Sequence, residues 1–113
     1  MAIYANLSID QGSDFSEELK IQDMSGEPAD LAGYTIKSEI RRTISSETKY
    51  DFVCTVTNAS DGVVVIGLPA ATSNAMRPGR YLYDVEIKSD ISNIITRVIE
   101  GQVEITGGIT RSL

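Results

Sequence analysis

The segment from Gly79 to Val85 constrains the fold of this chain more than any other. It reads Gly-Arg-Tyr-Leu-Tyr-Asp-Val and follows a stretch of small residues. Tyr81 stands two residues after Gly79, and Tyr83 follows on the same face of a predicted strand. This spacing is typical of a tyrosine corner, in which the phenol hydroxyl hydrogen-bonds to backbone a few residues upstream. We therefore predict that Gly79 and Tyr81 have a structural role where the chain crosses between two sheets.

The rest of the chain divides into short runs of strand-forming residues separated by turn residues. About seven such runs recur every 10 to 15 residues or so, which is close to the spacing of an all-β sandwich. We expect strands over residues 3–9, 15–21, 34–42, 52–56, 63–68, 81–88 and 94–105. Residues 69–76 are expected to form one or two helical turns. The sequence thus predicts an all-β, immunoglobulin-like sandwich of about seven antiparallel strands, with the tyrosine corner at its E–F crossing.

Two positions leave the strand register open. Glu17 falls on the same face as Phe15 and Leu19, so either a bulge changes the register there or Glu17 lies near the end of the sheet. Glu100-Gly101 is a second candidate for a bulge. Residues 94–99 before it are apolar on both faces, which a strand solvated on one side does not require.

Length and charge limit the classes of function. A chain of 113 residues provides one hydrophobic core, so we expect a single domain over residues 1–106 and a C-terminal tail over residues 107–113. The net charge is −6, and Arg41-Arg42 is the only adjacent basic pair, which argues against a nucleic-acid partner. No signal peptide or stretch long enough to span a membrane is visible. We expect a soluble protein that is synthesised in a cytoplasm and binds neither nucleic acid nor membrane.

Residues suited to catalysis are scarce. The sequence contains no histidine, which is the usual general base and the commonest metal ligand. The single cysteine, Cys54, shares a face with Phe52 and Val56 and is interpreted as a small core residue. The many carboxylates are interpreted as a solvated surface, because a glycosidase needs two of them across a cleft, usually beside aromatic platforms. We predict no catalytic residue and no enzyme activity.

The loop from Asp23 to Asp30 has a composition that could suit a cation. Asp23, Glu27 and Asp30 could supply oxygen ligands to Ca²⁺. The loop lacks the regular Asp-x-Asp-x-Asp-Gly spacing of calcium loops. We therefore predict no metal site and no cofactor, while calcium binding by this loop stays open.

The outer face of the sheet that contains residues 34–42, 81–88 and 94–105 is the candidate functional surface. If Tyr83 is buried, Leu82 points outward, and Val98 or Ile99 from the strand that is apolar on both faces is expected beside it. Adjacent exposed apolar side chains in a soluble domain indicate contact with another subunit. The alternative is scattered surface hydrophobicity, which requires no partner.

Three motifs occur in an order that resembles a known family. They are Asp-Leu-Ala-Gly-Tyr-Thr-Ile at 30–36 ahead of Ile-Arg-Arg at 40–42, Gly-Arg-Tyr-Leu-Tyr-Asp-Val at 79–85, and Thr-Arg-Val-Ile-Glu-Gly at 96–101. Together they resemble small tailed-bacteriophage virion proteins related to the N-terminal domain of phage baseplate upper proteins. The resemblance spans most of the chain. It implies an immunoglobulin-like module for assembly or attachment in the tail, baseplate or fibre of a virion, and it transfers no residue of known function.

We weigh three alternatives for function, although the resemblance itself implies no catalysis. The first is a non-enzymatic structural or assembly module in the virion, whose partners are further copies of itself or other tail or baseplate proteins. Residues 3–9, 94–99 and the tail are then the expected contact elements. The second is a carbohydrate- or cell-surface-binding module of a phage fibre, which the shortage of exposed aromatic residues counts against. The third, a small hydrolase, is disfavoured by the missing histidine.

Overall fold

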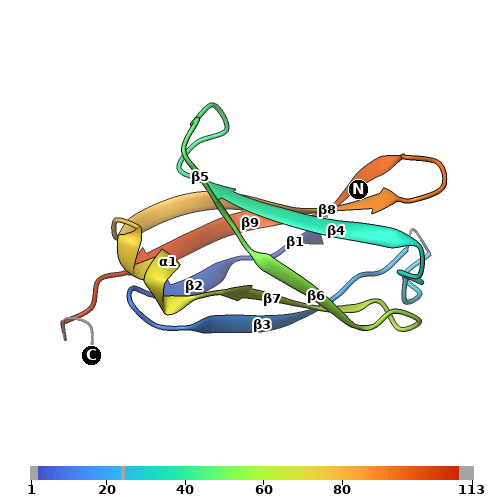
Figure 1. Cartoon of the computed structure of the whole chain (residues 1–113), viewed down its shortest axis with the longest axis horizontal. Coiled ribbons are helices and arrows are strands. Elements are labelled where there is room, and N and C mark those ends of the chain that lie inside the picture. The colour runs from blue at the N-terminus through green and yellow to red at the C-terminus, as the bar shows by residue number, and fades with distance from the viewer. Residues whose placement is uncertain (1–2, 24, 110–113) are drawn as a thin grey trace.

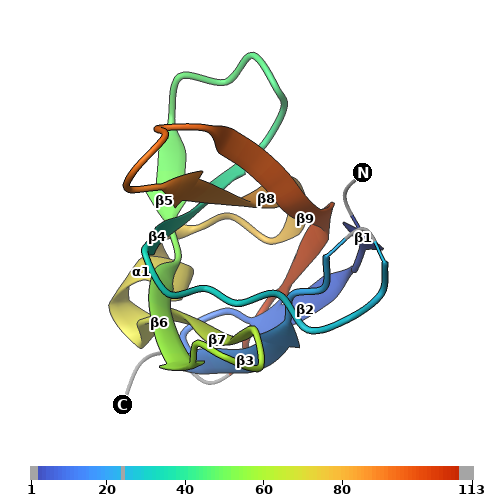
Figure 2. The ribbon, with the colours of Figure 1, turned by 90° about the vertical axis from the view of Figure 1, so that its right-hand side faces the viewer.

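The computed structural model describes residues 3–23 and 25–109, which form two β-sheets packed face to face (Figures 1 and 2). The larger sheet has the order β1-β9-β8-β4-β5, with β2 also pairing with β9. Its strands are β1 (Ile3–Tyr4), β2 (Leu7–Asp10), β4 (Tyr34–Arg41), β5 (Lys49–Asp51), β8 (Gly79–Ser89) and β9 (Ile95–Thr106). The smaller sheet has the order β3-β7-β6. Its strands are β3 (Phe15–Lys20), β6 (Val53–Asn58) and β7 (Val63–Leu68).

The topology is that of an immunoglobulin-like sandwich. Neighbouring strands are antiparallel, except that β1 and β2 run parallel to β9. The order β3-β7-β6 corresponds to strands B-E-D of the immunoglobulin fold, and β9-β8-β4 corresponds to G-F-C. The fold predicted from the sequence is therefore confirmed. The described part of the chain contains nine strands, because the first predicted strand is divided and β5 was not predicted.

The first predicted strand is divided at Ala5 and Asn6. The Ala5 N–H donates to the carbonyl oxygen of Glu100 at 2.9 Å. The side-chain oxygen of Asn6 then accepts a hydrogen bond from the Gln102 N–H at 3.0 Å. A side chain thus takes the place of a backbone carbonyl at the junction between β1 and β2.

Gly101 allows the backbone at Ala5 to lie against β9. A Cβ atom at Gly101 would collide with the carbonyl oxygen of Ala5. The same oxygen accepts a hydrogen bond of 2.6 Å from the hydroxyl of Tyr83. Burial raises the pKa of this hydroxyl to about 12. The bulge predicted at Glu100-Gly101 is wrong, since both residues pair regularly with β8. The register instead shifts at Val98, which has no partner in β8.

The tyrosine corner has the predicted geometry. The hydroxyl of Tyr81 donates to the carbonyl oxygen of Arg77 at 2.8 Å, four residues upstream. Gly79 has a φ of +138°, which favours glycine. The guanidinium carbon of Arg42 lies 4.9 Å from the centroid of the Tyr81 ring, within the range of a cation–π contact. These contacts fix the turn between the helix and β8.

The helical turns predicted after β7 form the helix α1 (Ala70–Ala75), for which Pro69 is the N-cap residue. The carboxylate of Asp14 accepts a hydrogen bond of 2.7 Å from the Ala70 N–H and so supplies the cap that proline lacks. The buried hydroxyl of Ser73 donates a hydrogen bond of 2.9 Å to the carbonyl oxygen of Ser13. Among the described residues, no helix has the length and apolarity needed to cross a membrane.

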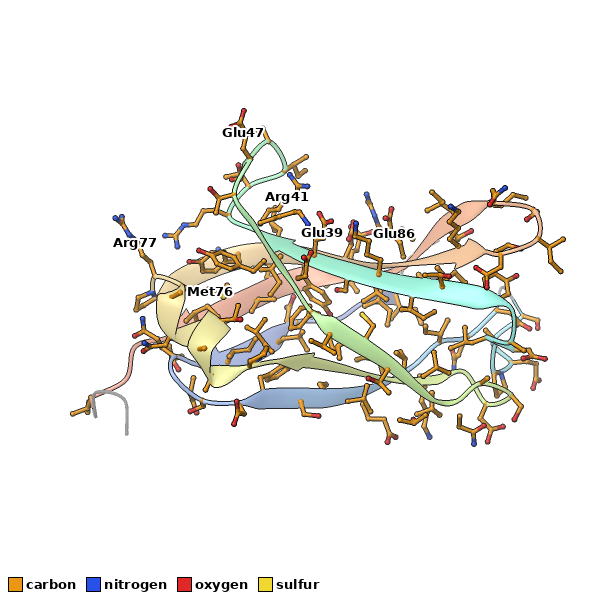
Figure 3. All side chains as sticks on the ribbon, in the orientation of Figure 1. Glu39, Arg41, Glu47, Met76, Arg77 and Glu86 are labelled. Atoms are coloured by element: carbon orange, nitrogen blue, oxygen red, sulfur yellow. The ribbon has the colours of Figure 1, made fainter. Side chains whose placement is uncertain are left out.

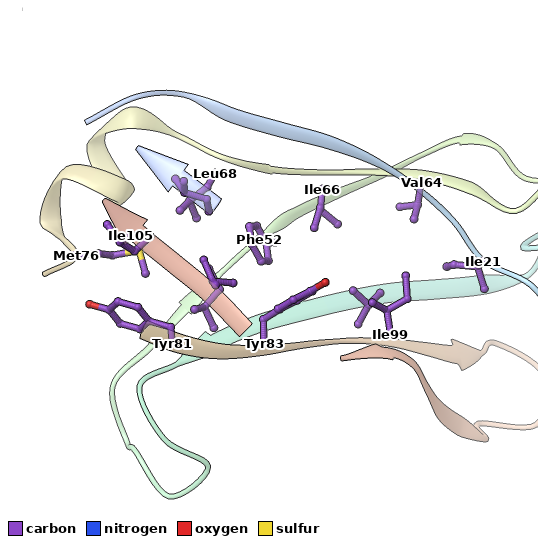
Figure 4. Close-up of a cluster of buried hydrophobic side chains, with 14 of the residues drawn as sticks. Ile21, Phe52, Val64, Ile66, Leu68, Met76, Tyr81, Tyr83, Ile99 and Ile105 are labelled. Carbon is purple, nitrogen blue, oxygen red and sulfur yellow. The ribbon is translucent and has the colours of Figure 1, made fainter. Parts of the chain in front are cut away.

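The core lies between the inner faces of the two sheets (Figure 4). Its centre is Phe52, at the point where the chain leaves the larger sheet for the smaller one. The ring centroid of Phe52 lies 6.0 Å from that of Phe15 and 5.9 Å from that of Tyr83. Further core residues include Ile9, Ile21, Ile40, Val64, Ile66, Leu68, Met76, Val85, Val103 and Ile105.

Burial along β6 falls with distance from Phe52. Cys54 is only partly buried but packs against the core, and burial raises the pKa of its thiol. Val56, predicted to face inward with it, is 37% exposed. β6 is an edge strand that pairs only with β7, which leaves its far end open to solvent.

Glu17 interrupts the apolar face of β3 without a bulge. It pairs with Ile66 in an unbroken register, while Phe15 and Leu19 on either side pack against the core. β3 is an edge strand, so the exposed Glu17 lies at the lateral edge of the sheet rather than at its end.

In the predicted tail, residues 107–109 follow β9, and residues 110–113 lie outside the described residues.

Candidate functional site: the outer face of the larger sheet

The outer face of the larger sheet is predominantly charged. The strands predicted to form this sheet, β4, β8 and β9, are indeed neighbours. Because side chains alternate along a strand, burial of Ile40, Tyr83 and Val85 directs the residues between them outward. Figure 3 shows Glu39, Arg41 and Glu86 pointing away from the smaller sheet. The outer face comprises Thr35, Lys37, Glu39, Arg41, Lys49, Asp51, Arg80, Leu82, Asp84, Glu86, Lys88, Arg97, Glu100, Gln102 and Glu104.

The strand register aligns four carboxylates in one row across this face. Asp51 of β5 lies opposite Glu39 of β4, and Glu39 lies opposite Asp84 of β8. Asp84 in turn lies opposite Glu100 of β9. Like charges directly opposite one another destabilise a sheet. The acidic row, Asp51-Glu39-Asp84-Glu100, therefore requires counter-charges.

Basic side chains on both sides neutralise part of the acidic row. The carboxylate of Glu39 lies 2.9 Å from the Arg41 guanidinium, 3.2 Å from the Lys37 ammonium and 3.3 Å from the Lys49 ammonium. The hydrogen bond from Arg41, followed by those from Lys37 and Lys49, lowers the pKa of Glu39 to about 2. The Lys49 ammonium also lies 3.0 Å from the Asp51 carboxylate, and this hydrogen bond raises the pKa of Lys49.

The β9 side of the acidic row is less completely paired. Asp84 forms one ion pair, at 3.2 Å, with Arg97. Within the part of the chain that the structure describes, Glu86 and Glu100 have no basic side chain within 4.0 Å. These two carboxylates leave an excess of negative charge on the β8 and β9 side of the face.

A shallow depression of about 440 Å³ lies over the acidic row. Glu39, Asp84 and Glu100 line it together with the buried Tyr83 and three apolar or aromatic side chains nearer the surface. These are Leu82, Tyr4 of β1, which is 61% exposed, and Ile44 of the β4–β5 loop, which is 88% exposed. The depression thus combines acidic and basic side chains with apolar and aromatic groups.

The apolar patch predicted from the sequence forms only in part. Leu82 points outward, as predicted, and lines the depression. Val98 is partly buried and packs against the core, and Ile99 is buried opposite Val85, so the outward position considered for Ile99 is wrong. Ile99 is in phase with the buried Val103 and Ile105, and the bulge at Val98 inserts one extra residue that turns Val98 inward and Arg97 outward.

Sequence reasoning missed Tyr4 and Ile44 because they come from β1 and a loop rather than from the three central strands. It also missed the acidic row. The alternation of the strands identified Glu39 and Asp84 as outward residues, but which residues face each other depends on the pairing of strands far apart in the sequence. No signal in a single chain sets that register.

Asp23 and Asp30, two of the three acidic residues considered for Ca²⁺, accept hydrogen bonds from neighbouring residues of the chain. One oxygen of Asp23 accepts hydrogen bonds from the Ser25 hydroxyl at 2.7 Å, the Ser25 N–H at 2.9 Å and the Glu27 N–H at 3.1 Å. The bond from the Ser25 hydroxyl is the main cause of a lowered pKa for Asp23. Asp30 accepts a hydrogen bond from the Ala32 N–H at 3.0 Å. Residues 3–23 and 25–109 contain no group of three or more His, Cys, Asp or Glu side chains arranged to hold a metal ion.

Comparison with solved structures identifies domains of similar fold at low sequence identity. The N-terminal domain of phage TP901-1 ORF48 superimposes with a TM-score of 0.57 and 9% identity, covering 90% of this chain and 85% of that one. InlP of Listeria monocytogenes has a TM-score of 0.49 and 13% identity, over 93% of this chain but only 28% of InlP. The filamin domain of Lin-41 has a TM-score of 0.43 and 15% identity, over 89% and 84% of the two chains.

Sequence comparison adds no closer relative. No model of a known protein family matches the chain. A search of curated proteins also finds no match. At 9% identity, the similarity to the phage domain is one of fold alone.

Proposed function

We propose that this protein is a non-enzymatic structural or assembly module of a tailed-phage virion, in the tail, baseplate or fibre, that acts through protein–protein contacts. The observation that carries the proposal is the similarity of fold to the phage TP901-1 ORF48 N-terminal domain over nearly the whole of both chains. The sequence motifs at 30–42, 79–85 and 96–101 support the same family. Its partners are further copies of itself or other tail or baseplate proteins.

The outer face of the larger sheet is the surface that we assign to these contacts. Rows of opposite charge on a rigid sheet favour one partner and one orientation, because a mismatched partner brings like charges together. Glu86 and Glu100 are available to pair with basic groups of a partner. Tyr4, Ile44 and Leu82 provide apolar contact around the depression.

The experiment that tests the proposal is to look for the protein in purified phage particles by quantitative mass spectrometry. We expect a fixed number of copies per particle. Reversing charge with Glu86→Lys and Glu100→Lys together should reduce incorporation, whereas Glu18→Lys, an exposed charge reversal on the smaller sheet, should not. A protein that is abundant in the lysate but missing from particles would contradict the virion role.

A carbohydrate- or cell-surface-binding module of a phage fibre is the second candidate. The observation in its favour is that exposed Tyr4 lines the same depression as Asp84 and Glu100, so an aromatic ring lies among hydrogen-bond acceptors. A glycan array separates the two candidates. Binding that is lost in Tyr4→Ala would support the second, and an array without signal would favour the first.

A further inference from the structure

The smaller sheet has two open edges, β3 and β6, each of which pairs only with β7. An edge strand presents a row of backbone N–H and C=O groups that have no strand partner, and another strand can pair with them. Native proteins protect such edges with charged or inward-pointing side chains. The two edges of this sheet differ in that respect.

The β3 edge is protected by charge. Its sequence, Phe-Ser-Glu-Glu-Leu-Lys, carries Glu17 on the inner face and Glu18 on the outer one. In a two-fold antiparallel pair, the residue on the axis faces its own copy. Full pairing of two β3 strands would place either Glu17 or Glu18 against itself, which destabilises the pair.

The β6 edge has no such protection. Its sequence, Val-Cys-Thr-Val-Thr-Asn, contains no charged residue and is rich in β-branched side chains that favour strands. Val53 is 57% exposed and Val56 is 37% exposed. Figure 1 shows β6 leaving the larger sheet and entering the smaller one as its outer strand. A bulge at Thr57 ends the regular part of the strand, so Val53 to Val56 is the segment open to pairing.

We propose that β6 is a self-association edge, through which two copies of this chain pair antiparallel about a two-fold axis at Thr55. The two small sheets then continue into one sheet. Thr55 faces its own counterpart, and Cys54 faces Val56 of the second copy, so no like charges meet. A threonine pair at the axis is a favourable cross-strand contact.

The uncharged, self-complementary sequence of β6 favours a second copy as the occupant, whereas the net charge of the chain opposes association and gives the dimer a distinctive salt dependence. Each copy carries a net charge of −6, so two copies repel each other over most of their surfaces. The uncharged β6 edge is a surface at which close approach brings no carboxylates of the strand together. Because salt screens the remaining repulsion, dimerisation should become stronger as ionic strength rises. An interface held by the ion pairs of the outer face would become weaker instead.

Sedimentation velocity over a wide range of concentration and salt tests the proposal. We expect a monomer–dimer equilibrium in the wild type. Thr55→Lys and Thr55→Glu should each weaken dimerisation about 100-fold or more, because each places a like charge against itself. An equimolar mixture of the two variants should form a heterodimer. Ser16→Lys, which adds the same charge to the exposed β3 edge, should dimerise as the wild type does.

Cross-linking tests the register directly. In a Cys54→Ser background, Thr55→Cys should form an intermolecular disulfide, since the axis brings the two copies of position 55 together. Ser16→Cys in the same background should not. Circular dichroism and thermal unfolding confirm that each variant is folded.

A wild type that stays monomeric at every concentration and salt, or an oligomer that persists in Thr55→Lys, would overturn the proposal. The virion role is tested separately, by incorporation into particles. A monomeric protein that is incorporated would refute the β6 edge and leave the proposed function standing.

Discussion

The inner and outer faces of the larger sheet are built from the same strands but depend on different properties of the sequence. On the inner face, Ile40, Tyr83 and Val85 are buried, and alternation along each strand is enough to predict this. On the outer face, the acidic row depends on how four strands are aligned with one another. The difference teaches that local pattern determines which side chains are buried in this domain, whereas the arrangement of charges on its outer face arises from non-local register.

Truncation of the central core side chain should have the largest effect. Phe52→Ala removes a buried ring that packs against Phe15 and Tyr83, and should lower the free energy of unfolding by about 3–5 kcal/mol. Urea unfolding measures the change. Ile44→Ala, on the 88% exposed loop residue, should leave stability within about 0.5 kcal/mol of the wild type. Similar losses for the two variants would contradict the division between the faces.

Adding a single methyl group at Gly101 should have the next largest effect. Gly101→Ala places a Cβ on the carbonyl oxygen of Ala5 and should destabilise the domain by about 1–3 kcal/mol. Hydrogen exchange should show the loss of protection concentrated at the Ala5 N–H. Gly107→Ala is the matched control, because its Cβ would meet only the Pro78 side chain, at 3.4 Å, and neither Gly101 nor Gly107 has a positive φ. Unchanged protection at Ala5 in Gly101→Ala would exclude the collision.

Loss of the hydroxyl at the tyrosine corner should cost less. Tyr81→Phe removes the hydrogen bond to the Arg77 carbonyl but keeps the ring, so we expect a loss of about 1 kcal/mol. Thermal unfolding with a matched Tyr34→Phe control, on a tyrosine that is 38% exposed, measures the difference. Equal stability of Tyr81→Phe and the wild type would refute a structural role for the corner.

Neutralising the outer face should have the smallest effect on stability. Glu39→Gln removes three partly exposed ion pairs and should cost about 0.2–1 kcal/mol, less at high salt. The pKa of Glu39 is about 2 in the folded chain and ordinarily 4.5, so the folded state holds its proton less tightly than the unfolded state. Its contribution is therefore complete above about pH 4.5 and disappears as the pH falls towards 2.

The pH dependence gives Glu39→Gln a direct check. Urea unfolding of the variant and the wild type should differ at pH 6 and converge as the pH approaches 2. A difference that is constant over this range would mean that the Glu39 carboxylate has no special interaction in the folded state.

The sequence predicted those parts of the fold that depend on neighbouring residues. The tyrosine corner at Tyr81, the helical turns after Pro69 and the burial of Tyr83 and Val85 each follow from a few consecutive positions. The partners of Gly101 could not be predicted, because its closest contact, Ala5, is almost the whole chain away in sequence. A glycine within a strand indicates either a bulge or a close approach, and only the structure distinguishes them.

The candidate site could be predicted only as a set of outward side chains. Alternation placed Leu82 correctly. It also predicts burial of Ile99, which is in phase with Val103 and Ile105, whereas the bulge that turns Val98 inward has no marker in the sequence. β5 was missed because its three residues are too few to show the alternation of a strand. Nevertheless, Lys49 neutralises the acidic row and Asp51 extends it.

The pairing of β1 and β2 with β9 has a consequence for how the domain is made. During synthesis, the first strand to leave the ribosome must wait for the last one, since its backbone partners are residues 99–106. The hydrogen bond from the Tyr83 hydroxyl to the Ala5 carbonyl can form only when β9 is present and Ala5 lies over Gly101. The chain between β1 and β9 is a long loop, and its closure costs entropy before the contacts between the two strands can form. This cost slows folding. The N-terminal strand is therefore expected to dock last, and the domain to be complete only after its whole length has been translated.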